Sequence, residues 1–186
     1  MKRAAEFALM MAGLLATWAG GALPPSAAAS PAIMAFSGSC AFSGHVRFEP
    51  PITNTPQSVR DIATASGTCS GTLTDSAGRT HTLNAAPVAY LATDQGSDVS
   101  CALSPHATGS GELVFPEGKL RFALSETRAS GVATLSLSGR GGASATGTAN
   151  ISPSANPALV VEQCAGTGLA SAPIDINIHT TPTISG

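Results

Sequence analysis

The sequence has 186 residues, with nine Lys or Arg against eleven Asp or Glu and a formal net charge of −2 at pH 7. This balance argues against a nucleic-acid partner, because binding to a phosphate backbone calls for a basic face. Charged residues make up only 11% of the chain, while Ala, Gly, Ser and Thr are abundant. The regular alternation of aliphatic residues argues against low-complexity disorder and favours a β protein built from small residues.

The N-terminal segment, residues 1–29, has the order of regions found in a secretory signal peptide. Lys2 and Arg3 precede an apolar run, residues 7–23, and small residues end the segment at Ala29. We predict cleavage after Ala29, a secreted or extracytoplasmic protein, and no stable membrane span after cleavage. The alternative is an uncleaved membrane anchor, for which the run is at the short limit of the about 17 to 25 residues that a span needs.

The remaining chain, residues 30–186, has the length of one domain and can bury most of its apolar surface. Without Lys2, Arg3 and Glu6 it carries seven basic and ten acidic residues, a net charge of −3. We expect a single all-β domain that is a monomer.

The four cysteines, Cys40, Cys69, Cys101 and Cys164, form an even set in an exported chain. Two disulfides are therefore expected, out of three connectivities. If the strands on either side of the loop at 50–58 are antiparallel neighbours, Cys40 lies opposite Cys69. We therefore predict a bridge between Cys40 and Cys69 and, by exclusion, one between Cys101 and Cys164. Metal binding is the alternative, but the chain has no C-x-x-C and no paired His, so we expect no metal and no cofactor.

Two strands are indicated after that loop, at residues 59–74 and 79–92. Residues 75–78 join them and have the Asp and Gly of a type I turn. Pro87 lacks the N–H that a central strand would donate, so the second strand is bulged there or lies at an edge. The next strand is expected at residues 99–103.

The segment 111–151 has the clearest pattern, in which four stretches alternate apolar and polar residues with period two. Turn residues separate the stretches, as in hairpins. The predicted register leaves three loops unpaired, at residues 116–119, 127–130 and 139–143. It places Phe115 opposite Leu120, and Leu137 opposite both Leu120 and Ala145. Side chains shrink along this row, which leaves room above the last strand for bulky side chains from a facing wall.

The C-terminal part continues with a loop at 152–157, a strand or short helix at 159–164 and a last strand at 174–180. No segment carries a helical period over ten residues. We predict an all-β fold, an antiparallel meander of about nine to ten strands closed as a β-barrel, or alternatively folded as a two-sheet β-sandwich. Sequential hairpins favour the barrel, and the two long connections favour the sandwich.

The chain has no G-x-S-x-G turn for a Ser nucleophile, and its acids are scattered along the sequence. A register with Thr74 opposite Thr80 places His81 beside Leu73 on the inward face. A His at a strand end is more often satisfied by a carbonyl or water than used as a general base. His81 and the nearby Tyr90 are therefore weak candidates for ligand binding, and no catalytic residue is predicted.

Three phrases are similar to those of small exported bacterial proteins, all-β proteins of actinobacteria that have no assigned activity. They lie at residues 67–73, 139–143 and 164–169. The resemblance spans most of the chain after residue 29, but its motifs are structural, so it implies no function.

Two classes of function are compatible with these features. We expect an exported protein that is not an enzyme, either a structural or interaction module of the envelope or a binder of a small apolar ligand. The ligand version requires a barrel whose Ala- and Gly-rich interior leaves a cavity. The alternative is a small secreted hydrolase or isomerase that uses His81 with Tyr90 or an acid, and it requires these side chains to meet in one pocket.

Overall fold

The computed structural model describes residues 33–140, 143–180 and 184–185, so the predicted signal peptide at 1–29 lies outside the described residues. The described chain forms nine strands and one short helix. Their bounds are β1 (Ile33–Ile52), β2 (Gln57–Asp75), β3 (Thr80–Val99), β4 (Leu103–Phe115), β5 (Gly118–Ala129), β6 (Val132–Ser138), β7 (Ser144–Ile151), α1 (Pro157–Ala165), β8 (Leu169–Thr180) and β9 (Ile184–Ser185).

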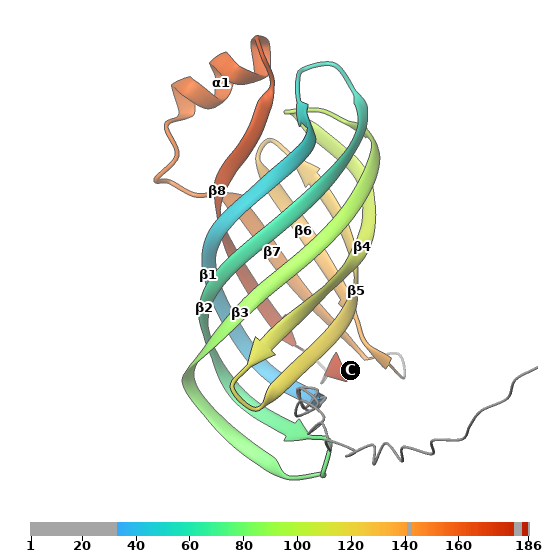
Figure 1. Ribbon diagram of the computed structural model, residues 1–186, viewed down its shortest axis with the longest axis vertical. Coiled ribbons are helices and arrows are strands. Elements are labelled where there is room, and N and C mark those ends of the chain that lie inside the picture. The colour runs from blue at the N-terminus through green and yellow to red at the C-terminus, as the bar shows by residue number, and fades with distance from the viewer. Residues whose placement is uncertain (1–32, 141–142, 181–183, 186) are drawn as a thin grey trace, which may run out of the picture.

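Eight of the strands form a closed antiparallel barrel. Each strand from β1 to β7 pairs with the next in the chain, and β8 pairs with β1 to close the sheet. The short β9 pairs with β1 beside Phe36. Figure 1 shows the tilted strands wound around the barrel, with α1 at one end and the turn between β2 and β3 at the other. The predicted meander and its closure as a barrel are confirmed, and the sandwich alternative is wrong.

Inward and outward side chains alternate along the strands, as the period of two predicted. In β6, for example, Ala133, Leu135 and Leu137 are buried and the residues between them are exposed. Aromatic rings fill the middle of the barrel. Their centroids lie 5.4 to 5.9 Å apart in the pairs Phe36–Phe115, Phe42–Tyr90 and Tyr90–Phe122.

The register of the first two hairpins in segment 111–151 differs from the prediction. Phe115 pairs with Gly118 and Leu120 with Leu113, while Leu137 pairs with Leu124. The reason is that both loops are two-residue turns, shorter than predicted. The turn between β5 and β6 has positive φ at its two central residues, Ser130 and Gly131, which matches the twist of the flanking strands.

These shifts move each strand by an even number of residues, so the inward face is unchanged. The third hairpin follows the predicted register, with Leu137 opposite Ala145 and Ala133 opposite Ala149.

The strand predicted at residues 99–103 is wrong. Strand β3 continues to Val99, and β4 begins at Leu103 after a tight turn in which the Ser100 N–H donates to the Leu103 carbonyl over 2.7 Å. Val99 and Leu103 therefore belong to different strands. The expectation for Pro87 is confirmed, because the β2–β3 register shifts next to it and β3 pairs with β4 only from Ala89 onward.

Both predicted disulfides are confirmed. Cys40 and Cys69 are direct partners in the β1–β2 ladder. The bridge between Cys101 and Cys164 joins the turn after β3 to α1, with 6.0 Å between the Cα atoms. The helix begins at Asn156, whose side chain accepts a hydrogen bond from the Ala158 N–H. Among the described residues, no helix has the length and apolar character of a membrane span.

We predict that replacing both Cys40 and Cys69 by Ala lowers the free energy of unfolding by about 2 to 4 kcal/mol, because the bridge closes a loop of about 30 residues in the unfolded chain. Guanidinium unfolding of the oxidised proteins measures the loss. Peptide mapping without reductant should find Cys101 and Cys164 still joined in the variant. Mixed pairing of the remaining cysteines, or an unchanged midpoint, would contradict the prediction.

Candidate functional site

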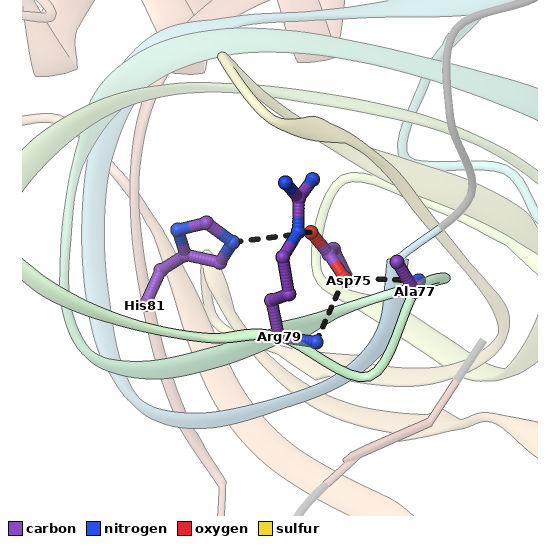
Figure 2. A network of polar contacts seen from close by, with 4 residues as sticks. All are labelled: Asp75, Ala77, Arg79 and His81. Atoms are coloured by element: carbon purple, nitrogen blue, oxygen red, sulfur yellow. Dashed lines mark hydrogen bonds and ion pairs between the residues drawn. The ribbon is translucent and has the colours of Figure 1, made fainter.

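His81 lies at the end of the barrel opposite α1, in a network centred on Asp75. The Asp75 carboxylate accepts hydrogen bonds from the backbone N–H groups of Ala77 and Arg79, each over 2.9 Å. The Arg79 Nε donates to it over 2.8 Å and the His81 Nε2 lies 3.2 Å away. Figure 2 shows both side chains directed toward Asp75. Because an ionised carboxylate only accepts, His81 must carry its proton on Nε2.

This network stabilises the turn between β2 and β3. The donors, led by the Arg79 N–H, hold the pKa of Asp75 well below its ordinary value. Every partner of Asp75 in the network comes from the six residues that follow it, as in a locally capped turn. His81 therefore has a structural role here.

Tyr90 lies in the aromatic middle of the barrel and is 2% exposed. Burial raises the pKa of its hydroxyl. It is nine residues from His81 on the same strand, roughly 30 Å away at the rise of an extended chain. The structure does not bring these two predicted site residues together, so His81 and Tyr90 do not share a pocket. The acid that His81 contacts is Asp75, the centre of the turn network.

A second group of polar side chains lies inside the barrel near α1, and we call it the mouth cluster. It consists of Asp61 on β2, Asp94 on β3, and Glu126 and Arg128 on β5. Asp61 and Asp94 are 6% and 5% exposed, and the side chains of Glu126 and Arg128 are 12% and 10% exposed. Three carboxyl groups thus lie near one guanidinium, and all four side chains are largely shielded from solvent.

Arg128 is held by three contacts. One terminal nitrogen donates to Asp61 Oδ2 over 2.8 Å, its Nε lies 3.5 Å from Glu126 Oε1, and its guanidinium lies 5.1 Å from the ring centroid of Phe48. These contacts leave three atoms of the cluster without a hydrogen-bond partner in the described protein, namely Asp61 Oδ1, Asp94 Oδ1 and Arg128 Nε. Buried polar atoms of this kind are few in native proteins and call for a specific explanation.

The protonation of the mouth cluster follows from this shortage of donors. Burial, with the nearby charges of Glu126 and Asp61, raises the pKa of Asp94 to about 8. Burial also raises the pKa of Glu126, which shares a hydrogen bond with Asp94. The pKa of Asp61 is raised by burial and held back by Arg128. At neutral pH the Asp94–Glu126 pair therefore retains a proton.

A cavity of about 50 Å³ lies beside the mouth cluster. Besides the four cluster residues, it is lined by Val46, Phe48, Ala63, Tyr90, Ala92, Leu124, Gly131, Ala133, Leu135, Ala149, Asn150, Ile151, Ile174 and Ile176. The charged wall is formed by β2, β3 and β5, and the wall of small side chains by β6 and β7. A water needs at least about 10 to 15 Å³, so the cavity has room for about three or four small atoms or waters.

The cavity adjoins an outer groove of about 560 Å³ between α1 and the barrel end. Gly131, Asn150 and Ile151 line both of them. The walls of the groove also include Val132 and Val161, which are 48% and 68% exposed. The cavity and the apolar groove are therefore neighbours that share part of one wall, in which the Ile151 N–H donates to the Gly131 carbonyl over 3.1 Å.

Sequence reasoning did not find the mouth cluster, although a signal for it was present. Asp94 has the same parity as Tyr90 in its strand, and Asp61 the same parity as Val59, so both point inward. Glu126 and Arg128 follow Leu124 in the same way, but the predicted loop at 127–130 removed Arg128 from the strand. Acids at inward positions of several strands predict a buried cluster only when the strands are known to be neighbours.

No group of three or more His, Cys, Asp or Glu side chains is arranged to hold a metal ion in the part of the chain that the structure describes.

We predict that the free energy of unfolding falls as the pH rises from about 4 to about 8 and then levels off. The folded protein keeps a proton on Asp94 that the unfolded chain releases near its ordinary pKa of 3.8, so a rise in pH favours unfolding between these values. Asp94→Asn should remove at least about 1.4 kcal/mol of this fall, the equivalent of one pKa unit. Urea unfolding at a series of pH values measures it.

Asp98→Asn is the matched control, because Asp98 lies on the same strand and is exposed. Parallel stability curves for Asp94→Asn and the wild type would show that Asp94 is ionised in the folded protein.

Comparisons of the chain with protein-family models, with curated proteins and with solved structures find no match. The geometry of the mouth cluster and its cavity is therefore the basis on which a function is inferred.

Proposed function

We propose that this protein is an exported, non-catalytic binder of a small ligand, which it holds in the α1 end of the barrel. The observation that carries the proposal is the pair of buried carboxyl groups, Asp61 and Asp94, that line the cavity and each keep one oxygen without a partner. A bound donor would satisfy these oxygens, whereas leaving a buried polar atom unpaired costs about 1 to 3 kcal/mol.

The shape of the site supports a binding role. An eight-stranded barrel is just wide enough to be filled by side chains or to hold one small ligand. Here aromatic rings fill the middle, and small side chains such as Ala133 and Ala149 leave the cavity at one end. This arrangement favours ligand binding over a purely structural or interaction role in the envelope.

The charged wall changes the kind of ligand expected. A wholly apolar molecule would cover Asp61 and Asp94 without pairing them, and burying unpaired polar groups is unfavourable. The ligand therefore has a polar end beside the mouth cluster and an apolar part against β6 and β7.

Export is supported by two independent features. The first is the order of regions in the segment 1–29. The second is the pair of disulfides, which form and persist mainly outside the cytoplasm.

We predict that Ala133→Leu blocks ligand binding without unfolding the barrel. The larger side chain enters the cavity, so the usual overpacking cost of about 1 to 3 kcal/mol should be largely absent. Native mass spectrometry of protein recovered from the envelope fraction should find a bound small molecule in the wild type and none in this variant. Thr134→Leu is the control, since Thr134 lies on the same strand and faces outward.

Loss of the bound molecule in both variants, or an empty wild type that no compound in a panel of four- to eight-carbon alcohols and amines stabilises against heat, would contradict the proposal.

A further inference from the structure

We propose that the ligand of this site is an organic ammonium, a primary or secondary amine with a short apolar chain, whose nitrogen is held between Asp94 and Glu126. This inference rests on the proposed function and adds the chemical class of the ligand. It is carried by the charges and contacts of the mouth cluster and by the apolar walls beside it.

The mouth cluster has three acids and one base, and this balance favours the binding of a cation. Asp61 and Arg128 form a 2.8 Å ion pair. This pair accounts for one acid and for the one basic side chain that lines the cavity among the residues that the structure describes. Asp94 and Glu126 are then two neighbouring acids whose one ion-pair contact among the described residues is the longer one, 3.5 Å from Arg128 Nε to Glu126 Oε1. Like charges this close cannot both be ionised without a counterion, so an ammonium group supplies the charge that the cluster lacks.

The hydrogen-bonding capacity points to the same group. An ammonium donates several hydrogen bonds and accepts none. The unpartnered Asp94 Oδ1 is an acceptor, and so is the unpartnered Asp61 Oδ1. Arg128 Nε is an unpartnered donor in the same cluster, but it is one donor beside two unpartnered acceptors. An anionic or carbonyl-containing head that only accepts would leave both aspartate oxygens unpaired.

The walls define the rest of the molecule. Ala133, Ala149 and Ile176 also line the cavity and offer apolar contact. The cavity of about 50 Å³ has room for the head and the first carbons only. A longer chain would pass Gly131 into the groove beside α1, where Val132 and Val161 are exposed. A short alkylammonium therefore fits better than an inorganic cation, which would gain no apolar contact with these walls.

Binding of an ammonium should release a proton. The groups that face Asp94 and Glu126 are Asp61 from β2, Arg128 from β5 and the Tyr90 hydroxyl from β3, while β1 contributes Phe48. The lining residues of β6, β7 and β8 include no titratable side chain. The proton that leaves is thus the one shared by Asp94 and Glu126, whose place the cation takes.

The test compares 1-hexylamine with 1-hexanol and hexanoate by isothermal titration calorimetry on the oxidised full-length mature protein. An alkylamine stays protonated from pH 6 to 8, as a Lys side chain does. We expect hexylamine to bind at least tenfold more tightly than hexanol at pH 7, and hexanoate not to bind. Its affinity should rise between pH 6 and 8, and the binding enthalpy should change with the ionisation enthalpy of the buffer, as proton release requires.

Asp94→Asn and Glu126→Gln should each reduce the affinity for hexylamine to that for hexanol and remove the buffer dependence. Both substitutions resemble the protonated side chain and keep its shape, and circular dichroism verifies the fold. Glu112→Gln is the matched control, because Glu112 pairs with Lys119 outside the cavity and its loss should leave binding unchanged.

The outcomes separate the two proposals. If hexylamine and hexanol bind equally well and Ala133→Leu abolishes the binding of both, the proposed ligand site is supported and the proposal of an ammonium ligand is overturned. Tight binding of hexylamine that survives Asp94→Asn and Glu126→Gln would also overturn it. Binding of none of the three probes, together with a wild type that carries no molecule from its host, would overturn both.

Discussion

The hydrogen-bonded closure between β8 and β1 is the constraint on which the rest of the structure depends. Because a closed sheet has no free edge, the inward side chains of all eight strands must share one lumen of nearly fixed width. The sizes of the inward side chains at each level then determine where the lumen is filled. The rings of Phe42, Tyr90 and Phe122 fill its middle, whereas the small side chains of β6 and β7 cannot reach across it at the α1 end.

The two ends of the barrel show that burial alone does not fix the charge of a carboxyl group. Asp75 and Asp94 are 4% and 5% exposed, almost the same. Asp75 is surrounded by donors from its own turn, and its pKa is lowered. Asp94 faces other acids and keeps an unpartnered oxygen, and its pKa is raised to about 8. At one end, the hydrogen bonds of the turn satisfy Asp75. At the other end, Asp94 keeps an oxygen that has no partner within the described protein.

Much of the fold could be predicted because strand parity is local information. The inward positions of Leu113, Phe122 and Leu135 follow from alternation, and the Cys40–Cys69 pairing follows from two neighbouring strands. Turn length is harder to predict from the sequence, because the two-residue turn at Ser130 and Gly131 depends on backbone dihedrals that many sequences can adopt. The mouth cluster was harder to predict. Asp61 and Asp94 are direct partners in the β2–β3 ladder only because the register shifts by one residue on the way, and Arg128 fell in a predicted loop.

The closure also has a consequence for the order of folding. The contact between Gly38 on β1 and the Thr180 side chain on β8 joins residues 142 positions apart. Hairpins such as β1–β2 can form as soon as their own residues are available. The pairing of β8 with β1 cannot form until nearly the whole chain has been made. Such long-range pairing slows folding, and until it occurs β1 presents an unpaired edge. If the protein is exported as we propose, the β1–β8 pairing would form only after most of the chain has crossed the membrane, whereas the β1–β2 hairpin with its Cys40–Cys69 bridge could form earlier.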